Sequence, residues 1–285
     1  MQKSTPNKYV FIADFFVDQV AGGGELNNEE AIKILRERGH DVQKINSHLA
    51  NLNFIGNNID KKFIIGNFIN LSAQSRDLLT EEAEYIIYEH DHKYLQTRDP
   101  SVFEDFSAPE AAIINRNFYK NAVATLCQSK FHADIVRKNL GYDNIINLGG
   151  NLWSEEILDF IENLSLKKKK NNISVMQSTN PIKNTYDAIT YCKIKKTSYD
   201  LIQPQPYKNF LTSLSKNDTF VFFPKTAETL SRVVVEARMM GMAVITNKLI
   251  GATSEEWFKF KGKDLVDTMR EQRKIIADKI ERSFV

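Results

Sequence analysis

The sequence predicts a two-lobed α/β protein in which each lobe is a parallel β-sheet flanked by helices. Short apolar runs typical of buried strands alternate with longer amphipathic stretches typical of helices. This alternation stops at the polar run 167–170 and then starts again. The chain has 285 residues, about twice the usual length of one domain. We therefore expect two domains, residues 1–168 and residues 169–285, with the second one reduced.

The first lobe begins with an apolar run over residues 9–16, which predicts a buried strand. Three glycines and a helix over 27–38 follow, and Gly39 is expected to end this helix. Consecutive strand–helix units of this kind predict a parallel sheet. Further strands are expected at 42–45, 62–65, 84–89 and 122–128, with a helix at 131–140.

The second lobe follows a charged run without periodicity at 167–170, continued by Asn171 and Asn172, which predicts a solvated linker. The last stretch, 262–284, has the apolar spacing of an amphipathic helix that packs on a lobe. Between these segments we expect strands at 173–176, Leu201, 219–223 and 243–246, and helices at 184–195, 207–214 and 229–240.

Composition narrows the possible partners and compartments. The 38 basic and 36 acidic residues give a formal net charge of +2, without the strong basicity of duplex-binding proteins. Nucleic acid is therefore not expected as the main partner. Cys127 and Cys192 are too few and too far apart for a disulfide framework or a thiolate zinc site. The first residues lack a signal-peptide pattern, and no apolar stretch reaches the roughly 20 residues of a bilayer span. We expect a cytoplasmic protein with at most peripheral membrane contact.

The segment over 220–247 is the most informative part of the chain, because it reads strand, loop, helix, strand. Its loop lies at the carboxyl end of a parallel strand, where open sheets bind ligands, and the start of the next helix favours a phosphate. Glu228 lies in the loop, and Glu236 lies in an apolar part of the helix. A buried carboxylate is costly unless hydroxyls or a cation satisfy it. Both an internal pair with Arg232 or another buried donor and a polyhydroxylated ligand meet this need, and the second carboxylate favours the ligand.

Seven residues separate Glu228 from Glu236, and Ala237, Gly241 and a predicted strand over 243–246 follow them. This order and spacing resemble the signature of glycosyltransferase family 4, the retaining enzymes of the GT-B fold that use nucleotide-sugar donors.

Two other segments carry the same resemblance. Three consecutive glycines and Glu25 follow the first predicted strand, and the segment over 127–136 is similar to the family's strand end and Ser-led helix. The resemblance implies two Rossmann-like lobes with parallel sheets facing a central cleft. It also implies retaining transfer of a sugar from a nucleoside diphosphate-sugar to a glycan or lipid-linked acceptor, with no metal or other cofactor.

The resemblance implies a role for each matching residue of the second lobe. Glu236 would bind the ribose hydroxyls, and Glu228 would bind the hydroxyls of the donor sugar. The backbone amides of Thr229 and Leu230 would bind the sugar or a phosphate. Lys183 would neutralise the diphosphate, whose developing negative charge needs fixed cations and dipoles.

Ser178 stands where the family usually has an arginine, about five residues before the diphosphate lysine. The resemblance then leaves Arg232 or Lys225 to supply the second positive charge. In the first lobe, Gly23 and Gly24 are expected to let a substrate approach the backbone, because a plain turn needs only one glycine.

His90 and His92 lie at the end of a predicted strand, flanked by Glu89 and Asp91. Such a group resembles a metal site, but no second cluster completes the ligand shell, so we expect no metal. The resemblance implies a histidine that faces the donor sugar, and either His90 or His92 fills that place. Plain polar contacts at the strand end explain both residues equally well.

Two alternatives to a transferase remain open. The first is another reaction on the same scaffold, such as nucleotide-sugar epimerisation or phosphorolysis, although no further acid–base set accompanies Glu228 and Glu236. The second is a noncatalytic or degenerate binding subunit, because a fold alone does not guarantee activity. Ser178 in place of the arginine and the short second lobe are the observations that favour it.

Overall fold

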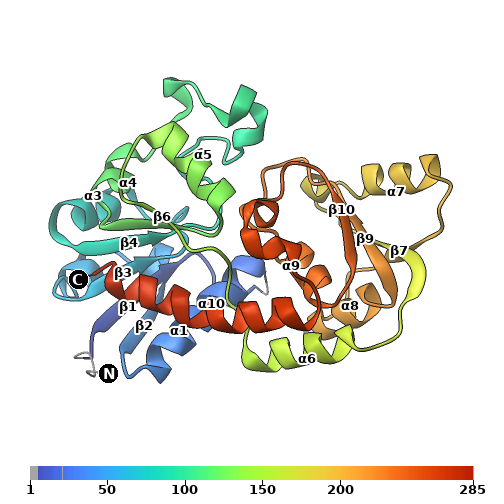
Figure 1. Cartoon of the computed structure of the whole chain (residues 1–285). Coiled ribbons are helices and arrows are strands. Elements are labelled where there is room, and N and C mark those ends of the chain that lie inside the picture. The colour runs from blue at the N-terminus through green and yellow to red at the C-terminus, as the bar shows by residue number, and fades with distance from the viewer. Residues whose placement is uncertain (1–5, 21, 285) are drawn as a thin grey trace.

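The computed structural model describes residues 6–20 and 22–284, and over these residues it has two lobes (Figure 1). The first sheet has six strands in the order β2-β1-β3-β4-β5-β6, and the second has four in the order β10-β9-β7-β8. Every strand pair in both sheets is parallel. The predicted α/β class, with two parallel sheets and a smaller second one, is confirmed. Residues 1–5 of the N-terminal segment lie outside the described residues.

The first lobe buries both faces of its sheet. Along β1, Val10 and Ile12 pack into one apolar cluster, while Tyr9 and Phe11 pack into another, because successive side chains of a strand point to opposite faces. Helices cover both faces, as a parallel sheet requires. Its strands are β1 Lys8–Ala13, β2 Asp41–Asn46, β3 Lys62–Ile65, β4 Glu84–Tyr88, β5 Ala124–Cys127 and β6 Ile145–Asn147. Its helices are α1 Gly23–Glu37, α2 Leu52–Gly56, α3 Ala73–Glu82, α4 Arg116–Asn121 and α5 Lys130–Leu140, with short 3₁₀ turns η1 Ser47–Leu49, η2 Pro100–Val102, η3 Glu104–Phe106 and η4 Glu110–Ala112.

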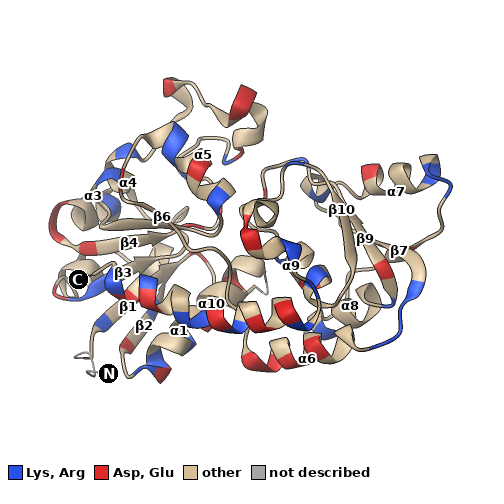
Figure 2. Ribbon diagram, viewed as in Figure 1, with Lys and Arg blue, Asp and Glu red and all other residues tan. Residues whose placement is uncertain are grey.

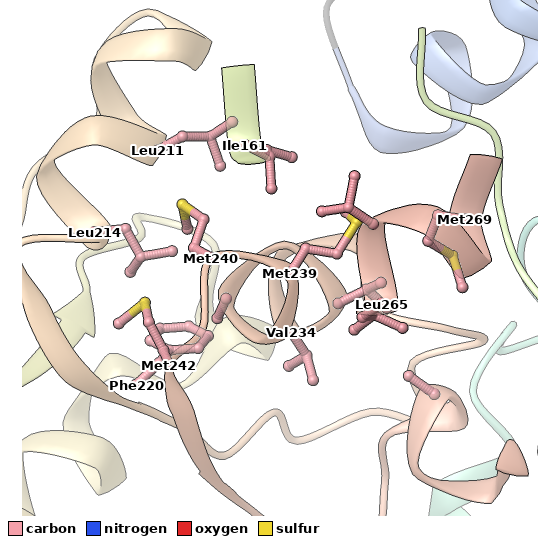
Figure 3. Packing of buried hydrophobic residues seen from close by; sticks show 14 of the residues in the cluster. Ile161, Leu211, Leu214, Phe220, Val234, Met239, Met240, Met242, Leu265 and Met269 are labelled. Carbon is pink, nitrogen blue, oxygen red and sulfur yellow. The ribbon is translucent and has the colours of Figure 1, made fainter. Parts of the chain in front are cut away.

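The second lobe has a methionine-rich core. Figure 3 shows Met239, Met240 and Met242, at and after the end of α9, packed among leucine and isoleucine side chains of neighbouring helices. Its strands are β7 Lys170–Met176, β8 Tyr199–Ile202, β9 Asn217–Phe222 and β10 Ala243–Thr246. Its helices are α6 Glu155–Ser165, α7 Thr185–Ile194, α8 Tyr207–Leu214 and α9 Arg232–Met239, with 3₁₀ turns η5 Pro181–Lys183, η6 Gly251–Ser254 and η7 Glu256–Lys259.

The lobes divide at a different place from the predicted boundary. Leu158, Ile161 and Leu164 of α6 are buried in the second-lobe core, although the prediction places this helix in residues 1–168. The predicted linker also differs, because Lys170, Asn171 and Asn172 form the start of β7. Lys170 pairs with Asn217 of β9, and Asn171 and Asn172 lie in an irregularity of the pairing before Ile173.

The last helix, α10 Lys263–Arg282, runs along both lobes (Figure 1). Leu265 and Met269 pack in the second-lobe core, whereas Ile276 and Ile280 pack in the core of the first lobe. The helix was predicted to pack on one lobe, and it packs on both. No helix among the described residues is long and apolar enough to cross a bilayer.

Candidate functional site

The carboxyl ends of the strands from both lobes face a cavity of about 350 Å³. An adjoining cavity of about 380 Å³ shares four of its lining residues and continues toward Asp91 and Asp99. We call these the first and the second cavity. The first cavity is lined by Gly23, Gly24, His90, Gln128 and Asn151 from the first-lobe side, and by Met176, Lys183, Glu228, Thr229, Ser231, Arg232 and Val233 from the second lobe.

Lys183 and Glu228 form an ion pair on the boundary between the two cavities. The Lys183 ammonium lies 2.7 Å from Glu228 Oε1, with 32% of the lysine side chain and 14% of the glutamate side chain exposed. Lys183 ends the short turn η5, and the backbone N–H of Glu228 donates to the Leu249 carbonyl at 2.8 Å. Two loops from different parts of the second lobe therefore place a cation and a carboxylate at one point of the cleft.

The start of α9 offers polar groups that the protein leaves unused. The Thr229 side chain is the exception, because its Oγ1 donates to the His90 carbonyl at 3.0 Å. Leu230 is fully buried and does not line the first cavity. Ser231 adopts φ +74°, a left-handed conformation that costs energy for a residue other than glycine, and its buried Oγ has no described partner. With the unsatisfied N–H groups of a helix start, these groups form an anion-binding surface.

Arg232 brings a second cation to the first cavity. Its guanidinium carbon lies 4.4 Å from the centre of the Trp153 ring, and its NH1 donates to the Leu152 carbonyl at 2.7 Å. A Cβ atom on Gly23 would lie 3.1 Å from the Arg232 side chain, so the glycine leaves space for it. Similarly, a Cβ atom on Gly24 would lie 3.6 Å from the His90 ring.

Of the two residues considered for the missing clamp arginine, the structure brings Arg232 to the site and not Lys225. Lys225 lines a separate cavity with Ser101 and Phe103. Ser178 does not line the first cavity. Its backbone N–H donates to the Thr185 hydroxyl at 3.1 Å.

Glu236 is buried behind the cavity and does not line it. Its Oε1 accepts hydrogen bonds from Trp153 Nε1 at 2.9 Å and from the Tyr207 hydroxyl at 2.6 Å, and Arg232 Nε lies at 3.7 Å. Burial and the nearby Glu236 charge raise the pKa of Tyr207 far above its ordinary value. These contacts correspond to the internal pairing that the sequence left open. The other oxygen, Oε2, accepts no hydrogen bond from a described residue.

His90 forms the first-lobe wall of both cavities. Its Nε2 lies 2.5 Å from Asn28 Oδ1, and its Nδ1 faces the Gln128 amide, so protein groups occupy both ring nitrogens. Burial, with help from the Lys93 charge, lowers the pKa of His90 to about 3. The ring is therefore neutral near pH 7 and keeps no nitrogen free for proton transfer.

His92 does not line the first cavity, but it borders the second. Its Nδ1 lies 3.1 Å from the Tyr94 hydroxyl, and its buried Nε2 has no described partner. Burial lowers the pKa of His92 to about 4. Within residues 6–20 and 22–284, no group of three or more His, Cys, Asp or Glu side chains could hold a metal ion.

A buried ionic cluster beneath His90 was not predicted. The Lys93 ammonium contacts Glu89 and lies 2.6 Å from Asp91 Oδ1, and the Tyr119 hydroxyl donates to Glu89. Burial raises the pKa of Glu89 to about 7, whereas Lys93 outweighs burial and keeps the pKa of Asp91 below its usual value. The cluster fixes the segment that carries His90 and Asp91 to the cavities. The sequence contains no signal of this cluster, because Glu89 to Lys93 is a loop, where a spacing of four residues does not bring side chains together.

No protein-family model matches the chain, and no curated protein matches it. Solved structures do. HepE (Alr3699) of Anabaena in complex with UDP and glucose has a TM-score of 0.56 at 11% identity, over 98% of this chain and 92% of that one. HepE with UDP-glucose gives 0.52 at 12% identity, over 97% and 92%. An alpha-glucosyltransferase with UDP and a 13-mer DNA gives 0.50 at 11% identity, over 97% and 92%. At such identities the likeness shows the fold alone, which is the predicted GT-B fold; membership of family 4 stays a prediction.

Proposed function

We propose that this protein is a glycosyltransferase that binds a nucleoside diphosphate-sugar in the first cavity and transfers the sugar to an acceptor in the second. One observation carries the proposal. Two cations, Lys183 and Arg232, meet the start of α9 and the carboxylate of Glu228 around one cavity between the lobes. A diphosphate needs the first three of these features, and a sugar with several hydroxyls needs the last.

The charge that develops on the leaving group explains the cations. When the bond between the anomeric carbon and the diphosphate oxygen breaks, the electron pair stays on the diphosphate. Fixed cations and backbone N–H groups stabilise this charge most effectively when they are already in place. Lys183 and Arg232 are each held by a protein partner before any ligand binds. They would move little to meet the two phosphates.

The remaining groups would bind the sugar and the nucleoside. Glu228 accepts hydrogen bonds from hydroxyls of the donor sugar, and the backbone N–H of Thr229 binds the sugar or a phosphate. Glu236 would offer only its Oε2 to the ribose, because Trp153 and Tyr207 occupy Oε1. UDP is the first nucleotide to test, since the matching HepE and alpha-glucosyltransferase structures contain it.

Transfer with retention fits the first cavity, because Glu228 and His90, the acid–base side chains among its described lining residues, already have protein partners. Glu228 is paired with Lys183, and both nitrogens of His90 are occupied. In the proposed step the acceptor oxygen bonds to the anomeric carbon on the face that the diphosphate leaves, and the acceptor proton passes to a phosphate oxygen. This route needs no protein base or metal.

The second cavity suits a neutral acceptor with hydroxyl groups, such as a glycan. Asp91 and Asp99 offer carboxylate oxygens to hydroxyls. Its two cations, Arg98 and Lys183, face three carboxylates, because Glu228 also lines this cavity, so the lining has no surplus of positive charge for an anionic acceptor. A glycan carried on a lipid is compatible if the sugar part enters the cavity.

Isothermal titration with UDP and a panel of nucleotide sugars tests the proposal. We expect at least one sugar donor to bind and to be consumed slowly in the absence of acceptor. The double variant Lys183→Met, Glu228→Gln should lose both properties, and Lys225→Met, outside the cavity, should keep them. Binding without turnover on any acceptor would support the noncatalytic alternative, and release of a free epimerised sugar would support an epimerase. Absence of nucleotide binding would overturn the proposal.

A further inference from the structure

Eight lysines gather around the amino ends of the strands of the second sheet, on the side opposite the cavities. The run 167–170 leads into β7, and further lysines follow the end of α7 and precede β9. Figure 2 shows blue segments in the loop before β7 and at the end of α7. We call this surface the lysine edge, and it consists of Lys167, Lys168, Lys169, Lys170, Lys193, Lys195, Lys196 and Lys216.

Hydrogen bonds show that these segments adjoin in space. The backbone N–H of Lys170 donates to the Lys216 carbonyl at 2.8 Å, and the Ser198 hydroxyl donates to Asn172 Oδ1 at 2.7 Å. Ser198 follows Lys196 by two residues, so the second bond joins the end of α7 to the start of β7. A run that looks like an isolated linker in the sequence is therefore one part of a larger basic surface.

The charges of the lysine edge are not compensated. None of its eight lysines forms an ion pair with any residue that the structure describes, whereas Lys263 and Arg270 on α10 both pair with Glu162 of α6. Two acids, Asp200 and Asp218, lie on the neighbouring strands, which leaves a surplus of six positive charges. The whole chain has a net charge of +2, so the rest of the molecule carries a net charge of −4.

Two aliphatic side chains project from the same edge. Leu166, next to Lys167, is 77% exposed, and Ile194, between Lys193 and Lys195, is 73% exposed. A cavity of about 570 Å³ lies between the end of α7 and the start of β7, and Lys195 and Lys196 are among its lining residues. The surface thus combines lysines outside ion pairs, exposed apolar groups and a cavity that Asp218 lines together with the two lysines.

We propose that the lysine edge docks the second lobe on an anionic lipid bilayer. Clustered lysines are attracted to the negative surface of such a membrane, and aliphatic side chains gain by entering the interfacial layer. A nucleic acid also attracts lysines, but its charged backbone provides no apolar layer in which Leu166 and Ile194 could be buried. An anionic lipid headgroup would occupy the cavity beside Lys195 and Lys196. The contact is peripheral, because it uses the loops at the amino ends of the strands and no spanning helix.

Docking in this way fixes the height of the cavities above the membrane. The lysine edge lies at the amino ends of the strands, and the cavities lie at their carboxyl ends. β7 has seven residues, so the two are separated by about 20 Å at roughly 3.3 Å per residue. The cleft is held above the lipid surface instead of against it.

Vesicle sedimentation with the full chain tests the proposal. We expect binding to phosphatidylcholine–phosphatidylglycerol vesicles, weak binding to phosphatidylcholine alone, and loss of binding as salt is raised. The variant with Lys167, Lys168, Lys195 and Lys196 changed to Gln should bind at least a hundredfold more weakly, at about fivefold per lysine. A control with Lys8, Lys61, Lys120 and Lys138 changed to Gln removes the same charge from the first lobe and should bind like the parent. Equal losses in the two variants, or equal binding to neutral vesicles, would overturn the proposal.

The aliphatic pair separates a bilayer from a nucleic acid. The double variant Leu166→Ser, Ile194→Ser should bind anionic vesicles several-fold more weakly and should bind a single-stranded DNA oligonucleotide like the parent. If the parent binds the oligonucleotide more tightly than the vesicles at equal salt, and the double variant leaves vesicle binding unchanged, the edge is a nucleic-acid surface and the proposal fails. Thermal stabilisation of each variant by UDP, compared with the parent, reports separately on the first cavity.

Discussion

The two walls of the first cavity differ in how their polar groups are used. On the first-lobe wall, Asn28 and Gln128 occupy both nitrogens of His90. On the second-lobe wall, the Ser231 hydroxyl has no described partner, and Lys183 shares a partly exposed pair with Glu228. A group that already has its partners gains little from a ligand, whereas an unsatisfied group gains a full interaction. The first wall also has one such atom, the buried Oδ1 of Asn151. The walls differ chiefly in charge, because Lys183, Glu228 and Arg232 all belong to the second.

The largest effect is expected from Lys183→Met, on the second wall. Turnover should fall by about 10²–10³-fold, the usual cost of removing one group that stabilises a developing negative charge. The free energy of unfolding should change by less than about 1 kcal/mol, because ion pairs that water reaches contribute little. Donor consumption and thermal unfolding measure the two quantities. Lys225→Met is the matched control, and unchanged turnover in Lys183→Met would remove the distinction between the walls.

Glu236→Leu tests a second-lobe residue whose contacts resemble those of the first wall. The change leaves the Trp153 N–H and the Tyr207 hydroxyl without their acceptor. We expect the free energy of unfolding to fall by about 3 kcal/mol, since each buried unsatisfied group costs about 1–3 kcal/mol. Urea unfolding measures this loss. Glu236→Gln keeps an acceptor oxygen and should lose about 1 kcal/mol, so equal losses in the two variants would contradict the buried hydrogen bonds.

The pH dependence of stability tests whether His92, a buried histidine that borders the second cavity, is held neutral. An unfolded histidine, with a pKa of about 6.5, gains a proton between pH 8 and pH 5. Folded His92, with a pKa of about 4, does not. Its depressed pKa contributes stability above the unfolded value, and this contribution is lost as the pH falls through that value toward the folded one. At pH 5 the loss is about 2 kcal/mol.

Comparison of the parent with His92→Phe isolates this contribution. The control is needed because the raised pKa of Glu89, about 7, acts with the opposite sign over the same range, giving stability that is lost as the pH rises. Urea unfolding at pH 8 and at pH 5 should show a change that is about 2 kcal/mol smaller in the variant. Identical pH dependence in the two proteins would mean that His92 is not held neutral.

The smallest effect is expected from Ser231→Gly. Glycine tolerates φ +74°, so the variant should be more stable by about 0.5–1 kcal/mol. UDP should bind several-fold more weakly, because one free hydroxyl is lost from the second wall. Ser231→Ala loses the hydroxyl and keeps the strain, so it should weaken binding without any gain in stability. Titration calorimetry and thermal unfolding distinguish the two variants.

The sequence predicted the parts of the fold that depend on continuous apolar runs. β3 and β10 match their predicted bounds, because each is a short run of four mostly apolar residues. Helix α6 was missed, although Ser154 caps it by accepting a hydrogen bond from the Ile157 N–H and its apolar residues have helical spacing. The Ser154 cap and the apolar spacing are local signals that are sufficient to predict this helix.

The site was predicted where it lies on one loop and missed where distant segments meet. Glu228 and Thr229 line the first cavity, and the loop that carries them was identified from its place after a strand. The burial of Glu236 depends on Trp153 and Tyr207, which are 83 and 29 residues away in the chain. No spacing within one segment reveals such a contact, because it is set by how the helices pack.

Helix α10 has a consequence for how the cleft changes its width. It is one unbroken rod anchored in both cores, and its Arg273 guanidinium binds Glu30 of the first lobe at 2.5 Å. A rigid swing of one lobe away from the other would have to bend this rod or pull its apolar side chains out of a core. A wide hinge opening of the cleft is therefore costly, whereas movements of the rim loops leave both anchors of α10 in place.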